Sequence, residues 1–186
     1  DNQPYGTILT DMFRNAFPNS AYGHVPIGTM EDLNAAEIGD FADFYDTYYV
    51  PNNATLSIAG DLDPKKTREL IEKYFGGIPK GTEEINRPDK DIPKLDGQVT
   101  DTVYDNIQLP AVITAYRTPE QGTKDAYAME MLATLLSDGQ SSRLYKKLVD
   151  EEQLALAVQA FPLALENAGL FGTFGLVNSG VEPSTL

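Results

Sequence analysis

The chain contains one histidine, His24, in the stretch AYGHVPIGT at residues 21–29. A catalytic zinc ion normally takes three protein ligands, and a histidine is nearly always among them. Glu31 and Asp32 follow His24 closely, but a capping box explains them better, because Thr29 suits the cap of a short helix and Asp32 its third position. We therefore predict no metal site at His24.

No other residue pattern supplies a complete catalytic site. The chain has no cysteine, which excludes disulfides, thiolate catalysis and cysteine-based zinc or iron–sulfur sites. A serine triad would have to use His24, and no serine lies in a Gly-x-Ser-x-Gly elbow. Neither YFGGIPKG at residues 74–81 nor SDGQSSR at residues 137–143 has the spacing of a phosphate-binding loop. We expect no catalytic residues and no metal ligands in this chain.

Composition and charge favour a globular protein that avoids nucleic acid. The 186 residues are 41% hydrophobic and carry a net charge of −14. Because such a charge repels phosphates, nucleic acid is not expected as a partner. A basic peptide suits this charge better, although acidity can also serve solubility alone. No apolar run is long enough to span a bilayer, and the first residues lack the pattern of a signal peptide.

Two further helices and a strand are predicted in the N-terminal part. Residues 54–60, ATLSIAG, read as a short strand, and a helix with Asp63 as its N-cap begins at Pro64. Residues 34–49 read as a helix capped by Asn34. Six of its large apolar side chains fall on one arc, which favours a core-facing surface: Ile38, Phe41, Phe44, Tyr45, Tyr48 and Tyr49.

The C-terminal part begins after a stretch at residues 78–97 that is rich in proline, glycine and charge and reads as a linker. The elements expected after it are strands at 98–106 and 110–118, helices at 123–137 and from Ser141 or Ser142 onward, and strands at 155–161 and 169–177. The predicted fold class is α/β, in the form of an α+β two-layer sandwich whose β-sheets are covered by helices.

Several blocks resemble the insulinase/pitrilysin family of zinc metallopeptidases, which includes the mitochondrial processing peptidases. The blocks are IGT, the Phe-Tyr and Tyr-Tyr pairs before PNNATL, AGDLD, KYFGGIP and GQSSRLYKKLVDEEQLALAVQA. The resemblance implies similar α/β domains arranged as a clamshell around a peptide-digesting chamber. Residues 1–80 would be the C-terminal part of a first peptidase-like domain, residues 81–97 a linker, and residues 98–186 the N-terminal part of a second, non-catalytic domain.

The family's chemistry is missing from this chain. Its zinc is held by a His-x-x-Glu-His motif plus a distal glutamate, and the motif's glutamate acts as general base. No Glu-His pair occurs here, so zinc is expected in the parent protein, upstream of residue 1. Many members also hold substrate with an arginine and, seven residues later, a tyrosine. Those substrate-binding positions correspond to Val149 and Leu156 in this sequence.

The resemblance implies a non-catalytic, substrate-cradling portion of a zinc metallopeptidase that hydrolyses peptides, inactive in isolation. The alternative is a catalytically dead homologue that serves as a binding or scaffold partner of an active peptidase subunit. Expected partners are a peptide substrate and a second peptidase-like domain or subunit, with no membrane span. Strand edges exposed by cutting such a fold would also favour self-association. The compartment stays open between the periplasm and the cytoplasm of a bacterium.

Overall fold

The computed structural model describes residues 3–87 and 90–186, and these divide into two compact units. The sheet unit comprises residues 3–26 and 90–186, and the helix unit comprises residues 27–87. The predicted division into residues 1–80, a linker at 81–97 and residues 98–186 concerns the domains of a longer parent protein, and it stays a prediction.

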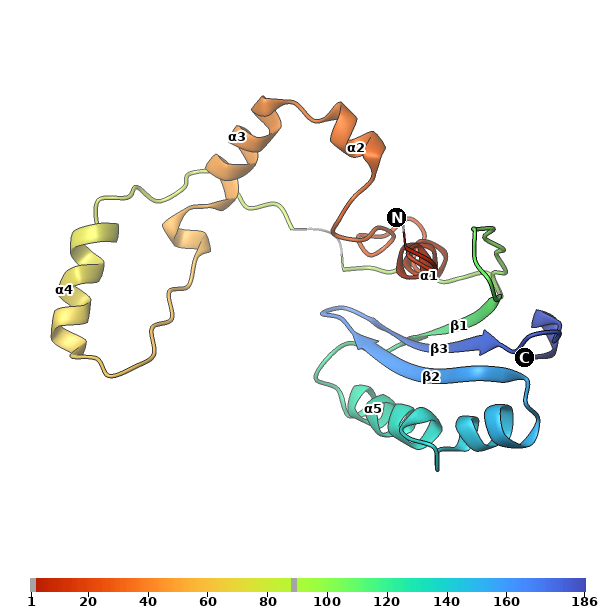
Figure 1. Cartoon of the computed structure of the whole chain (residues 1–186). Helices are drawn as coiled ribbons and strands as arrows, with labels where there is room; N and C mark the ends of the chain where they lie inside the picture. The colour runs from red at the N-terminus through yellow and green to blue at the C-terminus, as the bar shows by residue number, and fades with distance from the viewer. Residues whose placement is uncertain (1–2, 88–89) are drawn as a thin grey trace. The chain divides into compact units, whose positions relative to one another are not determined.

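The sheet unit is built on an antiparallel sheet of β1 (Ala111–Thr118), β2 (Ala155–Ala164) and β3 (Gly169–Val177) in the order β1-β3-β2 (Figure 1). The strands predicted at 110–118, 155–161 and 169–177 are thereby confirmed. Strands β2 and β3 form a hairpin, closed by a hydrogen bond from the Leu165 N–H to the Ala168 carbonyl at 2.8 Å. The fold is mixed α+β, as the sequence predicts in general outline.

Helices cover the sheet on both faces. Helix α1 (Ile8–Ala16) lies on one face and α5 (Lys124–Ser137) on the other (Figure 1). Successive residues of a strand point to opposite faces, and the central strand β3 uses this alternation. Leu170 packs in a buried cluster with Met12, Ala16 and Phe17, whereas Phe171 packs with Ala133 and Ala160. The two cores of the sheet unit therefore share one strand.

Arg117 of β1 joins α1 to the sheet. Its Nε donates to the Ala16 carbonyl at 2.5 Å, and its Nη1 donates to the Pro93 carbonyl. The guanidinium carbon lies 5.2 Å from the centre of the Phe17 ring, a cation–π contact. Burial lowers the pKa of Arg117, which is the expected direction for a desolvated cation. One side chain thus holds the end of α1 and the segment at Pro93 against β1.

A π-helix, η2 (Tyr145–Glu151), leads into β2. Residues 143–144 are α-helical and run directly into it, so the helix predicted after Ser141 or Ser142 is present. The Leu154 N–H bonds the Leu148 carbonyl at 2.9 Å, which reverses the chain in the manner of a Schellman motif. Gln153 occupies the left-handed position of this turn with φ 54°. Glycine normally fills that position because it has no Cβ.

The helix unit contains α2 (Met30–Ala35), α3 (Ile38–Tyr48), η1 (Pro51–Asn53) and α4 (Pro64–Phe75). The predicted Thr29 cap is confirmed, and so is the Asp63 cap, whose carboxylate accepts from the Lys65 and Lys66 N–H groups at 2.8 and 3.1 Å. The prediction of one helix over 34–49 capped by Asn34 is wrong. Asn34 lies inside α2, and α3 starts later, where the Glu37 N–H bonds the Asp40 carboxylate at 2.8 Å.

The predictions of strands at 54–60 and 98–106 are wrong, because neither segment has a ladder partner in the described chain. Residues 54–60 and 98–106 contain no β-strand. Side chains hold the second segment instead: the Asn15 amide donates to the Asp101 carboxylate at 2.9 Å, and this bond lowers the pKa of Asp101. Residues 183–185 form the short helix η3 (Pro183–Thr185) near the end of the chain. An alternating pattern alone did not make these segments strands, because a strand also needs a neighbour to bond.

We predict that Gln153→Gly stabilises the protein. The left-handed conformation costs a residue with a Cβ roughly 1–2 kcal/mol. Part of that gain is lost to the greater freedom of glycine in the unfolded chain, so the free energy of unfolding should rise by about 0.5–1 kcal/mol. Urea unfolding followed by circular dichroism measures this free energy of unfolding. The matched control Gln159→Gly, within β2, should lower the same quantity, and equal losses for both variants would contradict the assignment.

We also predict that Arg117→Lys destabilises the protein. A lysine ammonium keeps the charge but cannot serve two separate carbonyls in the way the planar guanidinium does. Loss of a hydrogen bond from a charged group should lower the free energy of unfolding by about 1.5–3 kcal/mol. The control Arg143→Lys replaces an exposed arginine and should change stability by less than about 0.5 kcal/mol. Similar values for the two variants would show that Arg117 does not join α1 to the sheet.

Candidate functional site

The residues around His24 do not form a metal centre. His24 is exposed in a bend, and the Asp32 carboxylate accepts from the Thr29 N–H at 3.1 Å and from its hydroxyl at 2.6 Å. Over residues 3–87 and 90–186 no three His, Asp or Glu side chains are grouped so that they could hold a metal ion. The donors present do not fit the family's zinc, so no step of zinc chemistry is assigned to this chain.

Val149 and Leu156 lie on neighbouring elements, since η2 packs against β2. Val149 is half-buried on η2, and Leu156 is 51% exposed at the start of β2. The register shifts between Ala155 and Ala157, so Leu156 occupies a β-bulge and has no partner residue on β3. Neither side chain can donate a hydrogen bond to a substrate carbonyl. Their role as substrate-binding positions stays a prediction.

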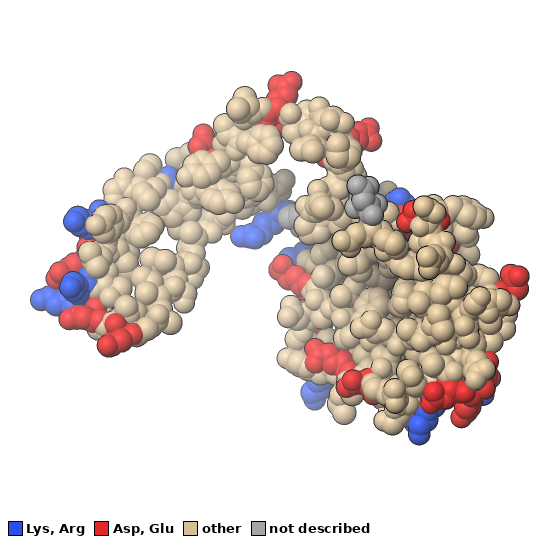
Figure 2. Space-filling model, viewed as in Figure 1, with Lys and Arg blue, Asp and Glu red and all other residues tan. Residues whose placement is uncertain are grey.

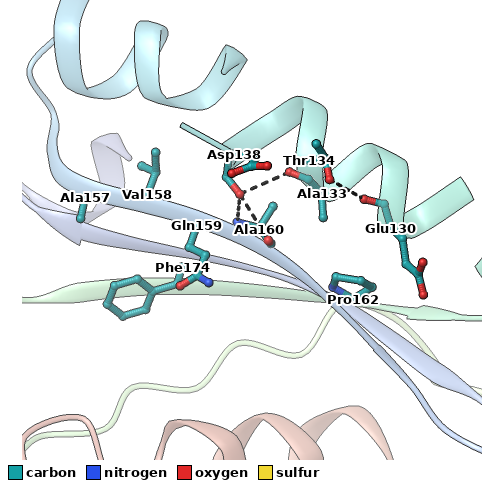
Figure 3. A pocket seen from close by; sticks show the side chains of 11 residues that line it. Glu130, Ala133, Thr134, Asp138, Ala157, Val158, Gln159, Ala160, Pro162 and Phe174 are labelled. Atoms are coloured by element: carbon teal, nitrogen blue, oxygen red, sulfur yellow. Dashed lines mark hydrogen bonds between the residues drawn. The ribbon is translucent and has the colours of Figure 1, made fainter. Parts of the chain in front are cut away.

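An open groove of about 560 Å³ runs along the outer edge of β2, beside the last turns of α5 (Figure 3). Strand β2 contributes Ala157, Val158, Gln159, Ala160 and Pro162, and α5 with its C-cap contributes Glu130, Ala133, Thr134, Ser137 and Asp138. No residue of this groove is among those singled out as site candidates from the sequence.

Ser137 and Pro162 limit which backbone groups of β2 are available for hydrogen bonding in the groove. The Ala160 N–H donates to Ser137 Oγ at 2.7 Å, so it points away from β3. In an antiparallel pair every second residue turns the same way, which directs Val158 and Pro162 into the groove as well. Pro162 has no N–H to offer. By this alternation Val158 directs both its N–H and its C=O away from β3 and toward the groove.

The charge of the groove is negative. Glu130 and Asp138 line it and are exposed, and no lysine or arginine is among the lining residues. Lys147, on η2, does not neutralise the groove, because its Nζ lies 2.9 Å from the Glu152 carboxylate. The hydrogen bond to Glu152 is the main cause of the raised pKa of Lys147. On the face of the sheet unit seen in Figure 2, acidic side chains gather at the end that carries α5. The groove therefore combines a free strand edge with two carboxylates.

The chemistry that this arrangement supports directly is binding. An extended peptide can pair with Val158 as an added strand, and a basic side chain or amine can lie near the carboxylates. Both hydroxyls of the groove are held by the backbone: Thr134 Oγ1 donates to the Glu130 carbonyl at 3.2 Å, and Ser137 Oγ donates to the Ala133 carbonyl at 3.3 Å and accepts from the Ala160 N–H. A sequence signal for the groove did exist: Pro162 follows the predicted strand at 155–161 directly, and proline in a strand marks a sheet edge.

Among the described residues, no helix is long and apolar enough to cross a membrane.

Comparison with known proteins identifies the family of the chain. Residues 36–183 match the family described as the Peptidase M16 inactive domain. The zinc protease PqqE of Helicobacter pylori is 33% identical over 188 residues, an alignment that covers 100% of this chain and 42% of that protein.

Solved structures agree with this match. A protease from Helicobacter pylori has 30% sequence identity and a TM-score of 0.86, over 100% of this chain and 45% of the other. The periplasmic protease PqqL from Escherichia coli shares the fold at 18% identity and a TM-score of 0.60, over 95% of this chain and 20% of the other. The chain thus spans less than half the length of these proteins. The resemblance seen in the sequence is confirmed, and the chain belongs to the M16 peptidase, or insulinase, family and carries its inactive domain.

Proposed function

We propose that this chain is the substrate-cradling, non-catalytic portion of a zinc metallopeptidase and that the groove along β2 holds part of an extended peptide. The observation that carries the proposal is the free backbone of Val158 in a groove lined by Glu130 and Asp138. Peptide recognition by strand addition draws affinity from main-chain hydrogen bonds and specificity from the side chains around the edge. Both kinds of contact are available here.

The geometry limits where a peptide can pair. Because Ser137 occupies the Ala160 N–H and Pro162 lacks one, Val158 is the residue on this part of the strand that can donate its N–H to a peptide. Glu130 and Asp138 then favour peptides that carry a lysine, an arginine or a free amine close to the paired residue. The substrate class that follows is an extended, basic peptide.

Hydrolysis itself belongs to the parent protein. We infer that zinc and its ligands lie outside these residues, and that the carbonyl-binding role of the family's Arg-Tyr pair is also met elsewhere, since Val149 and Leu156 stand at those positions. The partner that completes the enzyme is a second M16 domain or subunit. We place the protein in the periplasm or cytoplasm of a bacterium, and self-association of the chain through strand edges stays a prediction.

The presence of Val149 and Leu156 in place of the family's Arg-Tyr pair is also compatible with a second function, that of a scaffold. A catalytically dead homologue that supports an active peptidase subunit would have no use for the substrate-holding pair either. The two functions differ in the parent protein: a cradle belongs to a chain with a His-x-x-Glu-His motif, whereas a scaffold belongs to a chain without one. Metal analysis of the purified parent separates them, because a scaffold would retain no zinc.

The isolated chain is predicted to be inactive. After incubation with one equivalent of zinc chloride and dialysis, we expect much less than one zinc per chain and no hydrolysis of a quenched fluorescent peptide, since the described residues group no three metal donors. Atomic absorption and fluorescence measure the two quantities. Stoichiometric zinc together with peptide turnover would refute the proposal.

Basic peptides are predicted to bind the groove. A fluorescein-labelled peptide of ten residues with two lysines should bind more weakly to Glu130→Gln/Asp138→Asn, by about three- to tenfold, because each exposed charge contact contributes up to about 1 kcal/mol. Fluorescence anisotropy at low salt measures the affinity. The control Glu166→Gln/Glu182→Gln removes the same charge away from the groove and should bind as the wild type does.

The same assay tests the strand edge. Val158→Pro removes the N–H that faces the groove, and this position makes no ladder bond to β3, so the sheet should persist while peptide binding is lost. Unchanged circular dichroism with full binding would show that the peptide lies elsewhere.

A further inference from the structure

The two faces of β2 present different side chains to the groove. Ala160 packs in the cluster under α5, so Gln159, the residue before it, points to the opposite face. The partner of Gln159 on β3 is Phe174, which also lines the groove. In Figure 3 the side chains of Gln159 and Phe174 lie on the other side of the strand from Thr134 and Asp138. A ligand along this edge therefore meets two surfaces.

The two surfaces differ in chemistry. Both charged residues among the described lining of the groove, Glu130 and Asp138, belong to α5 and its C-cap. On the opposite face Phe174 is half-buried, and its ring meets the Tyr5 ring edge to face with the centroids 6.3 Å apart. Tyr5 is itself held in place, because its hydroxyl donates to the Leu109 carbonyl at 2.7 Å. One surface is thus acidic and the other is aromatic.

A peptide that joins β2 as an added strand meets both surfaces. Residues opposite each other in neighbouring strands point to the same face, and successive residues of a strand alternate. The peptide residue opposite Val158 therefore points toward α5 and its carboxylates, whereas the residues directly before and after it point toward Gln159 and Phe174. Phe174 stands one strand further in, but its side chain reaches the groove. An aromatic side chain of the peptide can meet this ring over the Gln159 amide.

We propose that the groove selects peptides in which a basic residue stands directly beside an aromatic one. The basic side chain lies near Glu130 and Asp138, and the aromatic side chain packs on Phe174, which thereby determines specificity. Adjacent residues of an added strand lie on opposite faces, whereas residues two positions apart share a face and compete for one surface. This selection rests on the proposed function, because it requires that the peptide joins β2 at Val158.

Two fluorescein-labelled peptides of identical length and composition test this selection. Each phenylalanine stands directly beside a lysine in the first peptide and two positions from a lysine in the second. Fluorescence anisotropy should show about three- to tenfold tighter binding of the first peptide, the gain expected from one additional aromatic pair. Equal affinities that both fall in Glu130→Gln/Asp138→Asn would overturn the selection and leave the proposed function intact. Equal affinities that survive both this change and Val158→Pro would overturn the two together.

A variant of the whole chain assigns the preference to one side chain. Phe174→Leu keeps an apolar side chain beside Tyr5 but removes the ring, so the two peptides should then bind within about twofold of each other. The matched control Tyr116→Leu replaces an aromatic residue that is 66% exposed on β1, outside the groove, and should retain the preference. Circular dichroism checks that both variants fold. A preference that persists in Phe174→Leu, or that is lost equally in Tyr116→Leu, would overturn the role of Phe174.

Discussion

The burial of β3 on both faces is the constraint on which the sheet unit depends. Leu170 and Phe171 are neighbours in sequence but belong to two different cores, one under α1 and one under α5. The glycines of the strand make room for this: a Cβ at Gly172 would meet the Phe161 ring at 2.5 Å, and one at Gly175 would meet Leu186 at the same distance. A strand with this pattern can only be central. Its position in turn makes β1 and β2 the edges of the described sheet.

The sequence allowed the central elements to be predicted because their patterns are local. GLFGTFGLV matches β3 from end to end, and the caps at Thr29 and Asp63 follow from side chains that bond the next turn. Residues 54–60 and 98–106 alternate just as well, yet they have no partner strand among the described residues, and pairing is a property of the whole fold. The split between α2 and α3 is not visible in the sequence, because Asn34 is a favourable N-cap residue, whereas in the structure the Glu37 N–H bonds the Asp40 carboxylate and α3 starts there.

Pro162 marks β2 as a sheet edge, but the spacing of residues in the sequence does not reveal the groove itself. Its parts come from the end of α5 and from β2, with Ser137 and Ala160 separated by 23 residues. The family's catalytic positions, in contrast, could be judged from the sequence alone, since a chain with one histidine cannot supply two zinc histidines. The absence of zinc ligands can therefore be read from the sequence. A strand edge that binds a peptide cannot, because it depends on the direction in which each backbone N–H and C=O group points.

The interruption of the β2 edge also bears on aggregation. Fibrils grow when five to seven consecutive residues can pair with another copy through an unbroken row of backbone groups, roughly the length of one short strand. Residues 155–161 are apolar enough to invite this. A bulge at Leu156, a hydroxyl on the Ala160 N–H and a proline at 162 divide the row into pieces. The strand that offers a docking point is therefore a poor template for fibril growth.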